Sequence, residues 1–126
     1  AFQHVNNLVY LRWFESARMA YLDRCQYASI MQREGVGPIL RDSSCRYRIP
    51  LTYPGNVISA VKVTKVEQDR CTMKHVLYSL DHGAIAAEGE AVIVFVNYQQ
   101  NCKAPIPAAI RDFILTHEPQ TPETVE

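Results

Sequence analysis

The stretch from Leu8 to Arg24 is the sequence feature that most restricts the fold. It contains no Gly or Pro and is dense in helix-forming residues, which predicts one long helix. When its residues are placed at about 100° per step, the polar side chains form only a narrow stripe of Arg12, Ser16 and Asp23. A helix that is apolar on most sides has to be covered by other structure. We therefore expect a central helix and not one on the surface.

After a segment rich in Gly and Pro at residues 33–38, which we predict to be a loop, the sequence changes to the pattern of β-strands. In the first strand region apolar and polar residues alternate, and the later regions are rich in β-branched and apolar residues. The expected strands cover residues 44–49, 57–67, 71–80 and 84–97.

Short turn sequences separate these strands, the first of them at residues 53–56, so the strands should pair antiparallel as a meander. Pro107 is suited to open a short helix that runs to Leu115, and the last ten residues look loose. Four strands can bury the long helix only by curling around it. The sequence thus predicts a single α+β domain over residues 1–126.

The composition argues against several classes of function. Thirteen basic residues balance thirteen acidic ones, and no basic run is present, so nucleic acid is not an expected partner. No apolar stretch approaches the ~20 residues of a membrane-spanning helix. The histidines and cysteines lack the spacing of metal ligands, so we expect no metal site. Free thiols in a reducing, cytoplasmic compartment are expected for the cysteines at 25, 45, 71 and 102.

Polar residues gather where the long helix should begin. Asn6 or Asn7 suits the N-cap, because a short polar side chain can accept a hydrogen bond from the free N–H groups of the first turn. These N–H groups and the helix dipole also suit such an end to stabilising an anion. His4 lies just before, either as an ordinary polar loop residue or as part of a catalytic site.

The opening sequence HVNNLVYLRWFESAR resembles the signature of the 4-hydroxybenzoyl-CoA thioesterase family, whose members are acyl-CoA thioesterases with the hot-dog fold. The stretches YRIPL, YPG, AAEG and PIP further along also resemble this family, so the likeness covers nearly the whole chain. It implies a long central helix wrapped by a curved antiparallel sheet. The matching positions of the opening motif are His4, Val5, Asn6, Asn7, Tyr10, Phe14, Glu15, Ala17 and Arg18.

Two departures from the family signature precede the helix. Gln3 stands where the family often has Gly, which would tighten that loop. The catalytic aspartate of the family precedes the histidine by four residues, and that position falls immediately before Ala1. We therefore expect the family's first strand and the start of its catalytic motif upstream of residue 1. The alternative is a chain that lacks this aspartate and is a weak catalyst.

The resemblance implies hydrolysis of an acyl-CoA or acyl-carrier thioester to a carboxylate and a thiol, with no cofactor. It implies catalytic roles for His4, Asn6 and Asn7, with the backbone N–H near Asn7 polarising the thioester carbonyl. Glu15 is a further catalytic candidate. Two alternatives are a non-catalytic acyl-CoA-binding protein and a hot-dog hydratase or dehydratase. The helix of the latter would not be expected to combine HVNN with FESAR.

Glu15 and Arg18 fall outside the polar stripe of the helix, and two interpretations are open. Three residues apart, they can form a buried ion pair that fixes the helix register. Alternatively, Glu15 lines the acyl pocket or serves the site of a partner subunit as a base or a water-positioning group.

The resemblance also bears on partners. The phosphates of coenzyme A need basic residues, and Arg46, Arg48 and Lys103 are candidates, although such residues also occur on ordinary solvated faces. A single curved sheet leaves its edges exposed. Hot-dog proteins pair such sheets edge to edge, which implies a homodimer or a homotetramer.

Overall fold

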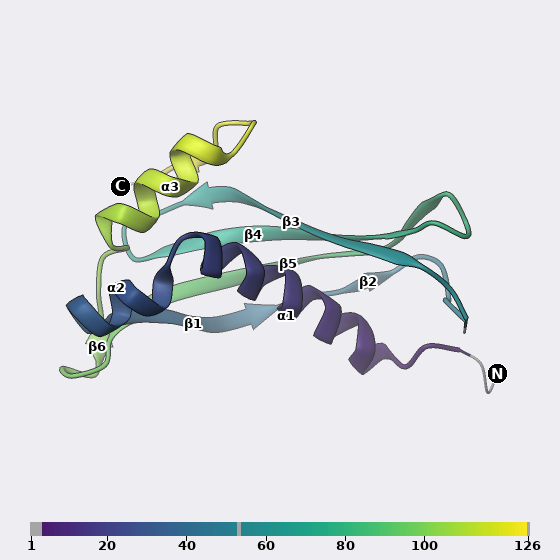
Figure 1. Cartoon of the computed structure of the whole chain (residues 1–126), viewed down its shortest axis with the longest axis horizontal. Helices are drawn as coiled ribbons and strands as arrows, with labels where there is room; N and C mark the ends of the chain where they lie inside the picture. The colour runs from purple at the N-terminus through teal and green to yellow at the C-terminus, as the bar shows by residue number, and fades with distance from the viewer. Residues whose placement is uncertain (1–3, 53, 126) are drawn as a thin grey trace.

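The computed structural model describes residues 4–52 and 54–125 (Figure 1). Gln3 and Tyr53, on which two of the sequence expectations depend, lie outside these ranges. The elements follow in the order α1 (Asn7–Arg24), α2 (Tyr27–Glu34), β1 (Val36–Ser43), β2 (Arg46–Tyr47), β3 (Val57–Val66), β4 (Arg70–Ser79), β5 (Ala84–Asn97), β6 (Cys102–Lys103), α3 (Ala108–His117) and β7 (Glu123–Thr124). None of the helices in these ranges is long and apolar enough to cross a membrane.

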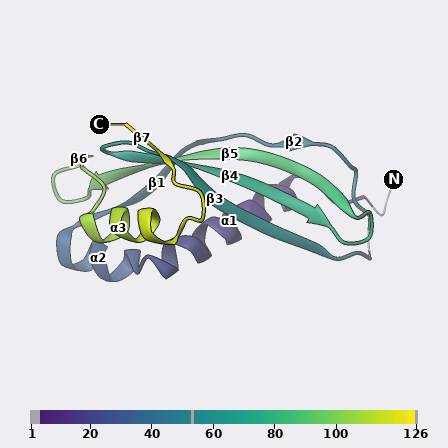
Figure 2. The same cartoon turned by 90° about the horizontal axis from the view of Figure 1, so that it is seen from above.

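The predicted antiparallel meander is confirmed for β3, β4 and β5 only. The strand expected at residues 44–49 is reduced to β2, which pairs with β5 and not with β3. β1 and the short strands β2 and β6 pair with β5, and β7 joins β3 in parallel. All three helices lie on the same side of this sheet, and its other face carries none of them (Figure 2). The α+β fold predicted from the sequence, a long helix against a curved and mostly antiparallel sheet, is confirmed.

The core forms between α1 and the sheet. Residues at alternate positions of β4 face α1 and are buried, as period two requires, among them Met73, His75 and Leu77. α1 contributes Tyr10 and Phe14 near its start and Leu22 near its end. These side chains fix α1 along the sheet and so determine where the start of the helix points.

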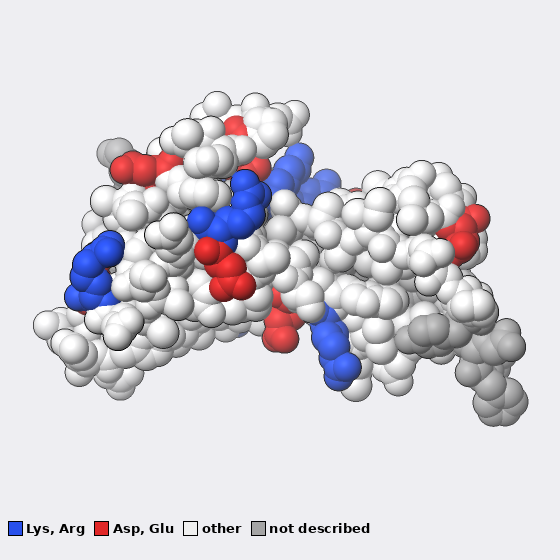
Figure 3. Space-filling view, viewed as in Figure 1, with Lys and Arg blue, Asp and Glu red and all other residues white. Residues whose placement is uncertain are grey.

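The single chain does not cover the whole of α1. Leu8 is 69% exposed, and Leu11 and Met19 are each 37% exposed, whereas Phe14 is only 2% exposed. The expectation that the chain buries the helix on most sides is therefore wrong for one protomer, because the sheet lies against only one side of α1. The face of the molecule on which α1 lies carries only scattered charges (Figure 3), and the exposed Leu8, Leu11 and Met19 are apolar.

The sequence analysis also missed detail near residues 25–45. α2 was not predicted, and the predicted loop at residues 33–38 holds both the end of α2 and the beginning of β1. Gly35 allows the chain to pass directly from α2 into β1, since its φ of +73° ends the helix in a left-handed conformation. Pro38 is tolerated because β1 is at the edge of the sheet. The predicted C-terminal helix is confirmed as α3, and β7 shows that the last ten residues are partly ordered.

Candidate functional site

The start of α1 is fixed by hydrogen bonds from both sides. Asn6 is the N-cap, and its side-chain oxygen accepts a hydrogen bond of 2.8 Å from the N–H of Leu8. One residue earlier, the N–H of Val5 donates to the carbonyl of Leu51 at 2.8 Å. His4 forms an isolated antiparallel bridge with Thr52. The segment that leads into the helix is thereby held against the chain that follows β2.

A cleft of about 300 Å³ opens beside this helix start. One wall comes from the beginning of α1 and the other from the segment after β2. The lining residues are His4, Val5, Asn7 and Tyr10 on the first wall and Tyr47, Arg48, Ile49 and Pro50 on the second. Asn6 does not line the cleft, because its side chain caps the helix. Two of the predicted site residues, His4 and Asn7, are thus brought together.

Tyr10 connects the two walls. Its hydroxyl accepts a hydrogen bond of 3.0 Å from the N–H of Leu51 and donates one of 3.4 Å to the carbonyl of Ile49. The rings of Tyr10 and Tyr47 meet edge to face, with centroids 5.0 Å apart. The sequence analysis named Tyr10 only as a position of the family motif and gave neither Tyr10 nor Tyr47 a role in the site. Their contribution depends on β2 folding back over the helix, which no local pattern encodes.

Tyr47 adds a hydrogen-bond donor to the cleft. Partial burial, together with the neighbouring Cys45, raises the pKa of the Tyr47 phenol above its usual value. The hydroxyl is therefore protonated at neutral pH. Within the described ranges, no three His, Cys, Asp or Glu side chains gather as metal ligands would.

Glu15 does not join the cleft. It lies eight residues after Asn7, about 12 Å along the helix at about 1.5 Å per residue, and its side chain is exposed. Arg18 is buried and lies 3.3 Å from His75 (Nη1 to Nε2), and no ion pair between Glu15 and Arg18 occurs among the described residues. The interpretation of a buried Glu15–Arg18 pair is therefore wrong.

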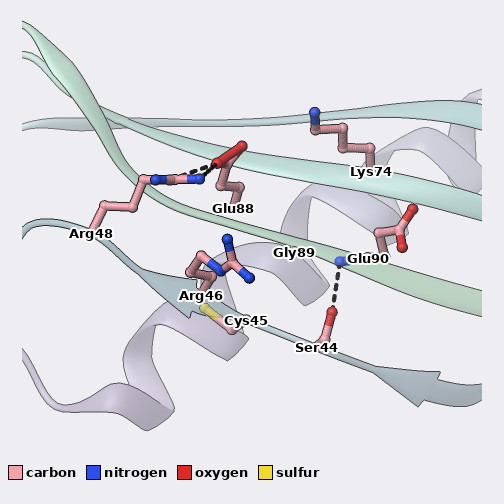
Figure 4. Close-up of a pocket in the computed structure, with 8 residues that line it drawn as sticks. All are labelled: Ser44, Cys45, Arg46, Arg48, Lys74, Glu88, Gly89 and Glu90. Atoms are coloured by element: carbon pink, nitrogen blue, oxygen red, sulfur yellow. Dashed lines mark hydrogen bonds and ion pairs between the residues drawn. The ribbon is translucent and has the colours of Figure 1, made fainter.

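A second cavity, of about 450 Å³, lies where β2 pairs with β5 (Figure 4). Arg46, Arg48 and Lys74 line it together with Glu88 and Glu90. Arg48 donates from Nε to a carboxylate oxygen of Glu88 at 2.6 Å. Figure 4 shows Arg46 and Lys74 without such a bond to the other residues drawn.

Arg48 lines both cavities, so the two are neighbours at the edge of the sheet. Lys103 is not part of either. It pairs with Val96 on β5, whereas Arg46 pairs with Glu88, and these two positions of β5 are eight residues apart, roughly 26 Å at about 3.3 Å per residue. The structure brings together two of the three predicted phosphate-binding residues and separates the third.

Comparisons with known proteins agree with this fold. A sequence model of the family described as the thioesterase-like superfamily matches residues 1–114. A comparison with curated proteins gives no match.

Solved structures of thioesterases resemble the chain over most of its length. A thioesterase from Thermus thermophilus, solved with coenzyme A and zinc, is 26% identical, with a TM-score of 0.77 over 91% of this chain and 81% of its own. A thioesterase superfamily protein from Jannaschia sp. CCS1 is 27% identical, with a TM-score of 0.78 over 92% and 73%. A 1,4-dihydroxy-2-naphthoyl-CoA thioesterase from Synechocystis has a TM-score of 0.79 over 93% and 86%, and at 13% identity it shows the fold alone.

Proposed function

The chain belongs to the thioesterase-like superfamily and has the hot-dog fold, and from this premise we propose that it hydrolyses an acyl-CoA thioester to a carboxylate and free coenzyme A. The cleft at the start of α1 is the observation that carries the proposal. It places an exposed histidine and the first residue of a capped helix beside an opening large enough for a thioester group.

The chemistry follows from the electrostatics of a helix start. Water adds to the carbonyl carbon, negative charge develops on the carbonyl oxygen, and the C–S bond then breaks to release the thiol. The backbone N–H of Asn7 and the helix dipole stabilise the negative charge. Losing one such donor costs about 2.7–4 kcal/mol of transition-state stabilisation. His4, at the same cleft, orients the attacking group or contacts the thioester, and Glu15 keeps its proposed role as a base or water-positioning group in a partner's site.

The neighbouring cavity suits the phosphates of coenzyme A. Arg46 and Arg48 supply guanidinium groups, which bind phosphate oxygens through paired hydrogen bonds. Because Arg48 borders both cavities, a coenzyme A whose thioester lies at the helix start has a path past Arg48 to Arg46. An acyl-carrier substrate would place its phosphopantetheine along the same path.

We also propose that the protein is at least a homodimer, paired along the edge formed by β1 and β2. This edge carries exposed apolar side chains, with Ile39, Leu40 and Tyr47 each 42% exposed. An open edge with exposed apolar residues is a surface on which a second strand can pair. The exposed stripe of α1 that contains Leu11 and Met19 extends the apolar surface.

A thiol-release assay with a panel of acyl-CoAs tests the proposed activity. The His4→Ala variant should lose most of its turnover without losing stability, because His4 is exposed. His117→Ala is the matched control, since His117 is also exposed but lies at the end of α3, far from the helix start (Figure 1). Coenzyme A binding without any thiol release would instead favour a non-catalytic acyl-CoA-binding protein.

All four cysteines are free thiols. This agrees with a reducing compartment, and a cytoplasmic location remains our prediction. Activity of the purified protein after full alkylation of its exposed Cys102 would show that this thiol takes no part in the reaction.

A further inference from the structure

A third cavity lies on the outer face of the sheet, and the proposed reaction as described so far does not use it. Its volume is about 290 Å³, and it is lined by Ala60, Val61 and Lys62 of β3 and by Lys74 and Val76 of β4. All three helices lie on the opposite side of the sheet, so none of them covers this outer-face cavity (Figure 2). A ligand can therefore enter it directly from solvent.

The outer-face cavity has an apolar floor beside two positive charges. Ala60 and Val76 pair directly across β3 and β4 and form the floor. Lys62 and Lys74 are the next pair on the same face of these strands, and both are exposed. A ligand that fits this arrangement has a flat apolar group for the floor and an anionic group for the two ammonium groups.

The two ammonium groups are not neutralised by carboxylates. Glu90 lies opposite Lys74 on β5, but the ammonium of Lys74 is directed away from it (Figure 4). Neither Lys62 nor Lys74 forms an ion pair within residues 4–52 and 54–125. Lys62 donates to the neutral side chain of Gln120 at 3.2 Å. Because like charges directly opposite each other on neighbouring strands are destabilising, a bound anion would relieve their repulsion.

The outer-face cavity continues the cavity proposed for the phosphates of coenzyme A, since Lys74 lines both. One row of paired residues also joins the two. Arg46 on β2 pairs with Glu88 on β5, and Glu88 pairs with Val76 on β4. Val76 in turn pairs with Ala60 on β3. Neighbouring strands are about 4.8 Å apart, so this row spans about 14 Å, and a ligand that extends along it from Arg46 reaches the apolar floor.

We propose that the outer-face cavity binds the adenosine 3′-phosphate end of coenzyme A, with the adenine on Ala60 and Val76 and the 3′-phosphate between Lys62 and Lys74. The proposal rests on the proposed thioesterase function. The pyrophosphate then lies in the neighbouring cavity, and the pantetheine arm passes Arg48 to the helix start. Because a carrier-bound phosphopantetheine has no adenosine 3′-phosphate, this cavity selects coenzyme A thioesters over acyl-carrier thioesters.

Binding of adenosine 3′,5′-bisphosphate, the nucleotide end of coenzyme A, tests the site without the reaction. In isothermal titration calorimetry, Lys74→Gln and Lys62→Gln should each weaken its binding about tenfold, because a charge-assisted contact with the 3′-phosphate is lost. 5′-AMP, which has no 3′-phosphate, should bind equally to wild type and to these variants. Lys103→Gln is the matched control, since Lys103 is also exposed but lies on β6, outside both cavities. Equal binding of the bisphosphate by wild type and both lysine variants would overturn the proposal.

Steady-state kinetics with an acyl-CoA and the matching acyl-dephospho-CoA, which lacks the 3′-phosphate, test the same site during turnover. In wild type, KM should be about tenfold higher for the dephospho substrate, with kcat unchanged. In Lys74→Gln this difference between the two substrates should nearly disappear. Thiol release with equal KM values for both substrates in wild type would refute the nucleotide site alone. Absence of thiol release from either substrate would refute the proposed function itself.

Discussion

The guanidinium of Arg18 on α1 lies 3.3 Å from Nε2 of His75 on β4, and both side chains are buried. Since arginine has only donors, Nε2 must accept this hydrogen bond, which leaves the proton of the neutral imidazole on Nδ1. Nδ1 has no hydrogen-bond partner among the described residues. The imidazole also stacks on Phe14, with ring centroids 4.8 Å apart. α1 is thus fixed to the sheet by a polar contact that depends on an uncharged histidine.

This contact predicts a loss of stability in acid. Burial, and then the charge of Arg18, lower the pKa of His75 from 6.5 to about 4. Above pH 6.5 the histidine is neutral in both the folded and unfolded states and contributes no pH dependence. Between pH 6.5 and about 4 only the unfolded state takes up the proton, so the free energy of unfolding should fall by about 3 kcal/mol as the pH falls through this window.

Urea unfolding of wild type and of His75→Gln at several pH values measures this effect. Glutamine keeps an acceptor for Arg18 but does not titrate, so the slope between pH 6.5 and about 4 should become flatter in the variant. His117→Gln, which removes a histidine outside the core, is the matched control. An equal slope in wild type and His75→Gln would show that another group causes the acid sensitivity.

The cap at Asn6 predicts a stability difference between two adjacent asparagines. Asn6→Ala removes the hydrogen bond to the N–H of Leu8 and should lower the free energy of unfolding by about 1 kcal/mol. Asn7→Ala should change it by less than about 0.5 kcal/mol, because surface substitutions without such a contact usually have small effects. Thermal unfolding followed by circular dichroism compares the two variants. Equal losses would mean that the cap contributes nothing specific.

Glu15→Gln separates structure from catalysis. Glu15 is exposed and makes no ion pair among the described residues, so the free energy of unfolding should change by less than about 0.5 kcal/mol. If Glu15 serves the partner's site as a base or water-positioning group, turnover should fall by about a hundredfold. Glu34→Gln on α2 is the control. Unchanged turnover in Glu15→Gln would remove Glu15 from the catalytic residues.

Arg48→Ala should weaken substrate binding more than it slows the reaction. Loss of a charge-assisted hydrogen bond, worth about 1.5–3 kcal/mol, should raise KM for acyl-CoA by roughly tenfold to a hundredfold with kcat little changed. Lys103→Ala should leave KM unchanged, because Lys103 pairs with the opposite end of β5 from Arg46. The KM values for the acyl-CoA and for the shorter acyl-pantetheine thioester, measured by steady-state kinetics, would show whether the effect of the substitution requires the nucleotide part of coenzyme A. A larger effect from Lys103→Ala than from Arg48→Ala would place the phosphates elsewhere.

The elements that local sequence determines were predicted well. The run without Gly or Pro that forms α1, the cap at Asn6 and the alternation in β4 all depend on neighbours within a few residues, as does the turn chemistry between the strands. α2 escaped prediction because it is only eight residues long and begins after Gln26, which is in a left-handed conformation and gives no side-chain cap.

Tertiary structure alone decided which residues meet. The sequence placed His4 and Asn7 at the start of a helix, but Tyr10 and Tyr47 joined them only when β2 folded over that start. It placed Glu15 and Arg18 three residues apart, but in the folded chain Arg18 contacts His75 of the sheet and Glu15 is exposed to solvent. Local hydrogen bonds and side-chain periodicity act over a few residues, so they can be predicted from the sequence. Contacts between residues far apart along the chain depend on how the whole chain packs, and packing selects the partners.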